Sequence, residues 1–147
     1  MAGKRWLRFC PVAAIPFLYV AMRGIHSPSQ TAERQSSRVA ISHALPALNG
    51  EKLVVNVVEV TYGPGGASPP HSHPCPVIAY VAEGEIRSQL EGQPEAVYKT
   101  GDSFYEAPNG VHAVSANASQ TSPAKLVAFF VCDHAVPLST PVERSHK

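Results

Sequence analysis

Short apolar runs rich in β-branched and aromatic residues alternate with turn-forming residues along most of the chain. The runs cover residues 53–62, 77–82, 86–90, 111–115 and 126–132. Glycine, proline, asparagine and aspartate separate them, as in Gly63-Pro64-Gly65-Gly66. No stretch keeps the 3.6-residue period of an amphipathic helix over a dozen residues. Several short strands at close spacing predict one all-β sandwich or barrel, which we place at residues 45–136.

The segments on either side of the expected barrel have a different composition. Residues 9–22 form an apolar run after the basic sequence KRWLR, which is the arrangement of an export signal. The run is shorter than the roughly 20 residues of a membrane-spanning helix, so we expect no stable membrane span in the mature protein. We therefore interpret residues 1–38 as a signal-like leader and linker, and residues 137–147 as a polar C-terminal tail. The expected location is periplasmic or secreted, with a cytoplasmic or organellar protein as the alternative.

The overall charge narrows the class of partner. The 147 residues carry 12 Lys and Arg against 11 Asp and Glu, a net charge of +1, which offers no basic footprint for nucleic acid. A hydrophobic content of 44% excludes a disordered chain. We therefore expect no nucleic acid as a partner.

The three cysteines are too few for a disulfide scaffold. If Cys10 leaves with the leader, Cys75 and Cys132 remain as a candidate pair in an oxidising compartment. We favour two separate thiols, since the sequence gives no distance between them.

Two of the seven histidines stand two positions apart, at His71 and His73. Side chains at i and i+2 of a strand point to the same face, so both imidazoles can address one point in space. A third, His112, follows a Pro-Asn-Gly turn at the start of a later run. Three neutral imidazoles from two strands would leave coordination positions open for water, oxygen or substrate, as in a catalytic metal site. The other histidines are interpreted as solvated side chains.

The spacing of these histidines and of nearby glycines resembles the two sequence motifs of the cupin family. The first motif, G(X)5HXH(X)3-4E(X)6G, is matched by Gly65, His71, His73 and Gly84. Its glutamate is missing, because Val77 stands at that position.

The second motif, G(X)5PXG(X)2H(X)3N, is matched at its two ends. Gly101 and His112 keep the separation of the family pattern, whereas Pro108 and Gly110 each stand one residue late. Ala116 occupies the asparagine position.

The resemblance implies a double-stranded β-helix, or jelly-roll barrel, with a metal in its mouth. The implied ligands are His71, His73 and His112. The family's fourth ligand has no counterpart, and we favour solvent in the vacant position. Two alternatives stay open: substitution by Glu106, Cys75 or Asn117, and a vestigial site without metal.

The lining of the pocket can be predicted from strand alternation. If Val77 points inward, so do Ala79 and Val81, and from His112 so do Val114 and Ala116. Such a small apolar lining suits a modest apolar or aromatic ligand with one oxygen donor to the metal.

We therefore expect a metal-dependent oxidoreductase of the dioxygenase type, with Fe(II) as the first choice and Mn, Zn, Ni or Cu as alternatives. A non-catalytic module that binds a metal or small ligand is the alternative function. A metal-assisted isomerase or hydrolase is a further one, and it would need a general base, for which Glu106 is the only acidic residue near the second motif. Fold alone does not separate these functions. The resemblance also implies a homodimer paired through sheet edges.

Overall fold

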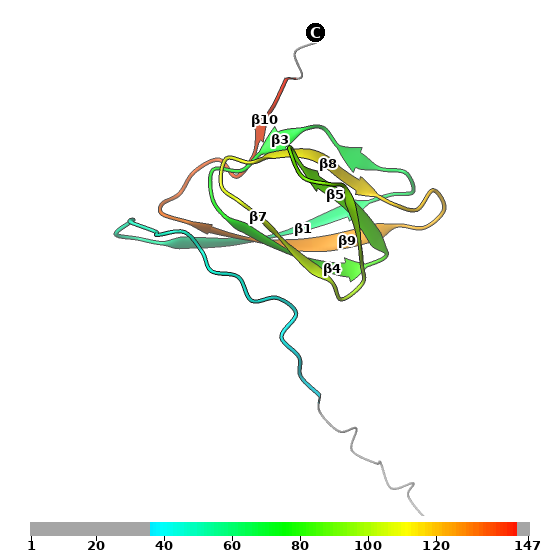
Figure 1. The fold of residues 1–147 in the computed structure, drawn as a ribbon, viewed down its shortest axis with the longest axis horizontal. Helices are drawn as coiled ribbons and strands as arrows, with labels where there is room; N and C mark the ends of the chain where they lie inside the picture. The colour runs from blue at the N-terminus through cyan, green and yellow to red at the C-terminus, as the bar shows by residue number, and fades with distance from the viewer. Residues whose placement is uncertain (1–35, 144–147) are drawn as a thin grey trace, which may run out of the picture. The chain divides into compact units, whose positions relative to one another are not determined.

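Two antiparallel β-sheets pack face to face in the computed structural model, which describes residues 36–143 (Figure 1). The strands are β1 (Val54–Tyr62), β2 (Ala67–Ser68), β3 (His71–Ser72), β4 (Val77–Glu83), β5 (Glu85–Leu90), β6 (Ala96–Lys99), β7 (Ser103–Glu106), β8 (Val111–Asn117), β9 (Ala124–Cys132) and β10 (Thr140–Pro141). One sheet has the order β1-β9-β4-β7, and the other has the order β10-β3-β8-β5-β6 with β2 also paired to β8. The predicted all-β jelly-roll barrel is confirmed. The apolar run at residues 9–22 lies outside the described residues.

The five predicted apolar runs correspond to β1, β4, β5, β8 and β9. β1 alternates between exposed and shielded residues along its length, as expected for a strand with one face on the core and one face toward solvent. The pattern did not predict β2, β3, β6, β7 and β10. These strands are two to four residues long, so pairing with a neighbouring strand defines them more than local alternation does.

The hydrophobic core lies between the two sheets. Val77 and Val81 of β4 and Ile86 of β5 are completely buried. Two aromatic rings, Phe104 and Phe130, close the core and are each 5% exposed. Complete burial of an aliphatic or aromatic side chain of this size stabilises a fold by roughly 1.5–3 kcal/mol, so these residues hold the sheets at a fixed spacing around the site described below.

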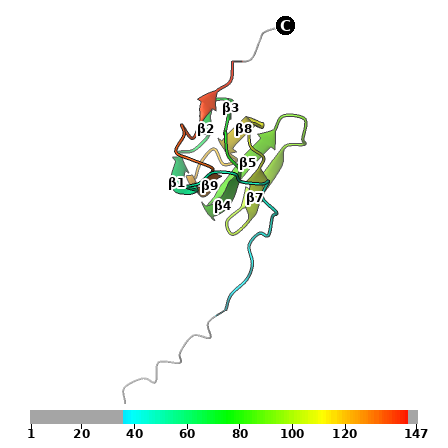
Figure 2. The same cartoon turned by 90° about the vertical axis from the view of Figure 1, so that its left-hand side faces the viewer.

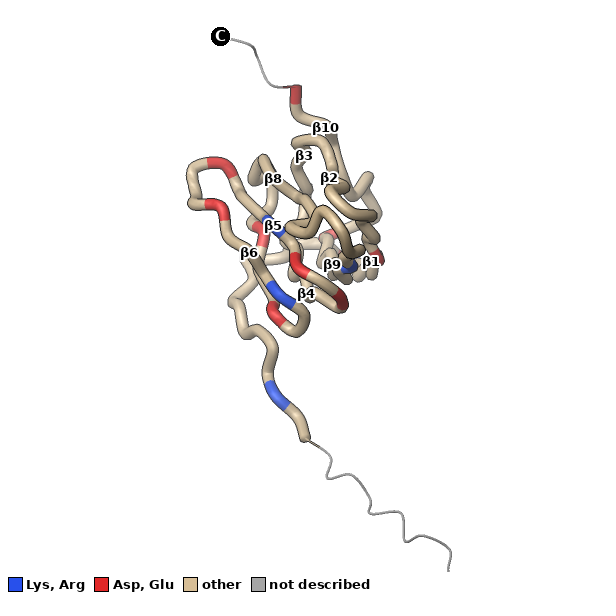
Figure 3. Tube along the Cα trace, turned by 90° about the vertical axis from the view of Figure 1, so that its right-hand side faces the viewer, with Lys and Arg blue, Asp and Glu red and all other residues tan. Residues whose placement is uncertain are grey.

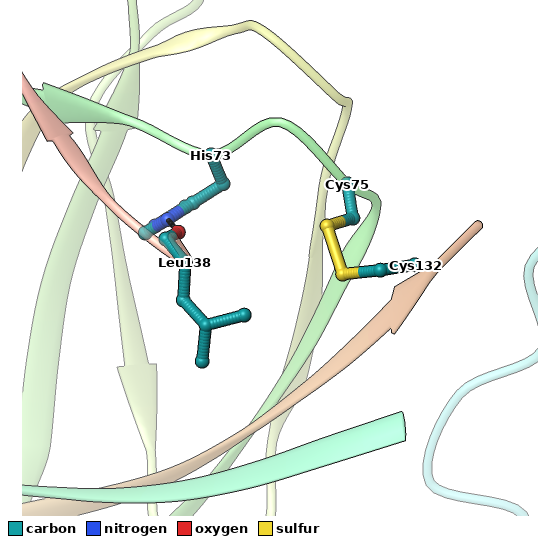
Figure 4. The surroundings of a disulfide bond; sticks show 4 residues. All are labelled: His73, Cys75, Cys132 and Leu138. Carbon is teal, nitrogen blue, oxygen red and sulfur yellow. Dashed lines mark hydrogen bonds between the residues drawn. A yellow bond between two sulfur atoms is a disulfide. The ribbon is translucent and has the colours of Figure 1, made fainter. Parts of the chain in front are cut away.

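Cys75 and Cys132 form a disulfide (Figure 4), so our interpretation of two separate thiols was wrong. Strand register explains the pairing. Val77 of β4 lies opposite Phe130 of β9, and continuing this antiparallel register by two residues brings Cys75 opposite Cys132. Their Cα atoms are 5.1 Å apart, a separation that a disulfide can bridge.

The glycines of the two motifs occupy turn positions that other residues adopt with difficulty. Gly84 has φ of 70° and Gly101 has φ of 93°, both in the region that favours glycine. A Cβ atom on Gly84 would also lie 2.6 Å from the carbonyl oxygen of Pro123. The two motif glycines therefore allow the tight connections from β4 to β5 and from β6 to β7.

The segment after Val136, which we expected to be a polar tail, belongs in part to the barrel. Leu138 packs against the core, and β10, the red strand in Figure 2, pairs with β3. In this pairing Pro141 lies opposite His71. Within residues 36–143, no helix is both long enough and apolar enough to cross a membrane.

Candidate metal centre

Three imidazoles, two from the six-stranded sheet and one from the residue after β3, lie close together. His71 on β3 and His112 on β8 are direct cross-strand partners, and His73 follows β3 immediately. One ring nitrogen from each histidine lies within 4.8 Å of the others. The structure thus brings together the three histidines that the sequence singled out, in an arrangement suited to a metal ion.

Backbone carbonyl groups fix two of the rings. Nδ1 of His71 donates a hydrogen bond to the carbonyl oxygen of Pro69 at 2.7 Å. Nδ1 of His73 donates to the carbonyl oxygen of Leu138, also at 2.7 Å (Figure 4). With the proton on Nδ1, each ring keeps a lone pair on Nε2, the form of imidazole that binds a metal. Metal-ligating histidines usually hydrogen-bond in this way through their other nitrogen.

The third ring has a different environment, between a hydroxyl group and a carboxylate. Nε2 of His112 lies 2.9 Å from Oγ of the buried Ser88 on β5. Nδ1 of His112 lies 3.0 Å from Oε2 of Glu106, and the same oxygen lies 3.5 Å from Nε2 of His73. Glu106, which we considered from the sequence as a general base and as a substitute ligand, therefore lies beside two of the three histidines.

Glu106 is at the end of β7 and is only 5% exposed. Its Cα partner across the sheet is Val77 of β4, the residue that replaces the glutamate of the first motif. A carboxylate is thus present beside the histidines, one strand away from its place in the family pattern.

The other two substitutes considered from the sequence are engaged elsewhere. Cys75 is bonded to Cys132 and has no thiolate to offer. The amide of Asn117 donates to the carbonyl oxygens of Gly63 and Ser122 at 2.9 and 2.7 Å. Asn117 therefore stabilises the two turns that contain Gly63 and Ser122.

Burial lowers the pKa of His71 below its ordinary value. The hydrogen bond to Pro69 and the charge of Glu106 act in the opposite direction, while His73 and His112 lower this pKa further. The net effect favours the neutral imidazole, which is the form that coordinates a metal.

Two cavities meet at the histidines. An inner cavity of about 70 Å³ is bounded by all three rings together with Glu106. An outer cavity of about 350 Å³ is bounded by His71, His73 and apolar side chains that include Val58, Phe130 and Leu138.

The structure divides the residues that we expected to line the pocket into three groups. Val77 borders the inner cavity. Ala79 and Val81 are buried in the core and border neither cavity. Val114 and Ala116 border a separate surface pocket.

A β-bulge in β8 explains why Val114 and Ala116 border the surface pocket and not the cavities at the histidines. Leu90 of β5 is the partner of His112, but the preceding residue Gln89 is the partner of Val114, so β8 carries one extra residue. The extra residue reverses the alternation, and Ser115 instead borders the inner cavity, with its hydroxyl 2.9 Å from that of Tyr62. The residues 111–117 carry no proline or glycine that would signal the bulge.

The barrel is similar in sequence to known proteins. Residues 58–130 match the family model described as a cupin domain. A germin-like protein, subfamily 2 member 2, from Arabidopsis thaliana is 30% identical over 114 residues, which cover 73% of this chain and 50% of the relative. The chain thus spans about half the length of that relative.

Solved structures show the same fold. A cupin-like protein from Thermotoga maritima has a TM-score of 0.52 and 25% identity, with 60% of this chain and 64% of the other covered. A recombinant oxalate oxidase in complex with glycolate has a TM-score of 0.53 and 21% identity, with 78% and 68% covered. Two antiparallel sheets, both sequence motifs and the matched family model lead to one conclusion: this protein belongs to the cupin superfamily.

Proposed function

We propose that the protein is a metal-dependent oxidoreductase of the dioxygenase type that acts on a small apolar or aromatic molecule. The observation that carries this proposal is the convergence of three imidazoles, within 4.8 Å, at an inner cavity that all three border. His71 and His73 also border the outer cavity. The histidines offer ligands to the inner cavity, and the outer cavity offers room for an organic molecule.

The donor set fits a divalent transition metal, with Fe(II) as our first choice. Imidazole nitrogens suit iron, copper, nickel and zinc, and a nearby carboxylate oxygen also suits manganese. When bound, such an ion supplies Lewis acidity toward a substrate oxygen and redox chemistry toward dioxygen. The protein's part is to hold His71 and His73 in one tautomer through the carbonyl oxygens of Pro69 and Leu138.

The outer cavity favours a ligand without strong charge. Its volume of about 350 Å³ lies at the lower end of the range for small-molecule sites. No lysine or arginine among the described residues borders either cavity. The short strands β2, β3 and β10 beside the site carry no charged residue either (Figure 3). A small phenol or diketone, with one oxygen toward the histidines and its apolar part against Val58 and Phe130, matches these properties.

One observation favours a non-catalytic module that binds a metal or small ligand. The inner cavity of about 70 Å³ is much smaller than the roughly 300–1,000 Å³ of small-molecule sites. A substrate and dioxygen would therefore compete for limited space next to the histidines. This alternative predicts stable metal binding without turnover.

We also propose that the mature domain works in an oxidising compartment, the periplasm or the extracellular medium. The Cys75–Cys132 disulfide is a bond that persists in such compartments. The leader at residues 1–38, with its basic start and apolar run, gives a route of export.

The test combines metal analysis with oxygen uptake. Protein purified without a histidine tag is analysed for bound metals, loaded with Fe(II) under anaerobic conditions, and mixed with a panel of phenolic and dicarbonyl compounds in an oxygen electrode. We expect one bound metal per chain and oxygen uptake that depends on one class of compound. The matched control His71→Ala should abolish both. Stoichiometric iron without uptake on the whole panel supports the binding module and contradicts the enzyme.

A further inference from the structure

We propose that Glu106 supplies, from β7, the carboxylate that the first motif lacks at Val77, so that the metal centre has three imidazole ligands and one carboxylate ligand. This inference rests on the metal centre proposed above. It replaces the solvent that we expected in the fourth position with a side chain of the protein.

The first argument for Glu106 as a ligand is the register of the four-stranded sheet. Val77 on β4 and Glu106 on β7 are directly opposite each other. Both side chains point into the barrel, since Val77 is completely buried and Glu106 is 5% exposed. Opposite residues on one face have Cβ atoms about 4.5–5.5 Å apart, so a carboxylate on β7 can reach the space that a glutamate at position 77 would occupy.

The second argument for Glu106 as a ligand is a pair of buried polar atoms without hydrogen-bond partners. Among the described residues, Oε2 of Glu106 and Nδ1 of His112 are buried atoms without a hydrogen-bond partner, although they lie 3.0 Å apart. When Nε2 of His112 donates to Oγ of Ser88, Nδ1 keeps a lone pair that faces the carboxylate oxygen. Two such acceptor atoms at this distance repel each other unless a proton or a metal cation lies between them, and a metal cation would satisfy both atoms.

The third argument is the need of the buried Glu106 carboxylate for a counter-charge. A buried carboxylate needs a counter-charge or several hydrogen bonds, and the ionisable side chains that the structure places beside Glu106 are those of His73 and His112. A neutral imidazole provides no counter-charge. A divalent cation bound by His71, His73 and His112 would provide it, and the carboxylate in turn would lower the net charge of the centre from +2 to +1.

The first experiment measures Co(II) binding, because Co(II) reports its ligands through visible absorption. Glu106→Gln removes the charge and keeps the shape of the side chain. Glu85→Gln is the matched control, because Glu85 is an exposed residue that pairs with Lys99. We expect Glu106→Gln to lower the Co(II) affinity at least about tenfold and to shift the absorption bands, and Glu85→Gln to change neither.

The second experiment moves the carboxylate back to the family position. In the double variant Val77→Glu/Glu106→Val, the two facing positions exchange a carboxylate for an isopropyl group, and we expect most of the Co(II) affinity lost in Glu106→Gln to return. Circular dichroism of the metal-free variants reports whether each is folded. If the double variant does not fold, the Co(II) affinity of Glu106→Gln alone tests whether Glu106 is a ligand.

The outcomes separate this inference from the proposed function. If folded Glu106→Gln binds Co(II) with wild-type affinity and spectrum, Glu106 is not a ligand, while the three-histidine centre stands. If the wild-type protein binds no Co(II), the centre itself is wrong and the inference fails with it.

Discussion

The imidazole of His73 is hydrogen-bonded to the backbone of Leu138, a residue 65 positions later in the chain. Leu138 also packs against the core and borders the outer cavity. The C-terminal segment therefore has two tasks: its carbonyl oxygen fixes the tautomer of a candidate ligand, and its side chain forms part of the cavity wall.

Removal of this segment should weaken metal binding. A chain that ends at Pro137 loses the carbonyl oxygen of Leu138 together with β10, and we expect a loss of metal affinity on the order of 10–100-fold, as for other partners of metal-binding histidines. A chain that ends at Glu143 keeps both and should bind as the full chain does. Competition titration with a chelator measures the difference. Equal affinities for the two truncations would show that the His73–Leu138 hydrogen bond plays no part in metal binding.

A larger side chain in the outer cavity should block ligands and spare the metal. Val58 borders that cavity, whereas its neighbour Val57 points outward and is 57% exposed. We expect Val58→Phe to weaken binding of a catechol probe at least about tenfold, with unchanged metal content, and Val57→Phe to have little effect. Isothermal titration of the metal-loaded variants tests this. The outer cavity is not the ligand site if both variants bind the probe as the wild type does.

Metal retention should depend on pH through the imidazoles. Protons compete with the metal for the ring nitrogens, and burial lowers the pKa of His71, so this ring stays neutral to a more acidic pH than an exposed histidine. We expect metal content to be constant from about pH 8 down to the ordinary histidine value of about 6.5 and to fall below it. Dialysis at a series of pH values followed by elemental analysis gives the curve. Full metal content well below this range would argue against imidazole ligation.

Loss of the disulfide should destabilise the barrel. The bond joins residues 57 positions apart in the sequence, and a cross-link of this span restricts the unfolded chain enough to stabilise the fold by about 2–4 kcal/mol. We expect Cys75→Ala/Cys132→Ala to lower the free energy of unfolding in urea by this amount. Cys10→Ala, which leaves the bond intact, is the control. An unchanged free energy of unfolding in the double variant would contradict the stabilising role.

The sequence predicted the features that depend on local pattern. Alternation and turn residues located the five long strands, and the i, i+2 spacing of His71 and His73 placed two rings on one side of the chain. Agreement with two motifs then added His112 on a distant strand.

Features that depend on the register between distant strands were not predictable from the sequence. The disulfide requires β4 and β9 to be neighbours in one particular register. The position of Glu106 beside the histidines requires β7 to pair with β4 so that Glu106 faces Val77. No proline or glycine in residues 111–117 indicates the bulge between His112 and Val114. Because of this bulge, the side chains of β8 after His112 point to the opposite faces from those that we expected.

The central claim is that the histidine cluster binds a metal, and elemental analysis of untagged protein tests it most directly. Wild-type protein and the double variant His71→Ala/His112→Ala are purified in parallel, loaded with Fe(II) under anaerobic conditions and passed through a desalting column. We predict about one metal ion per chain in the wild type and almost none in the folded double variant. Equal metal content in both proteins, or none in the wild type, would contradict the assignment.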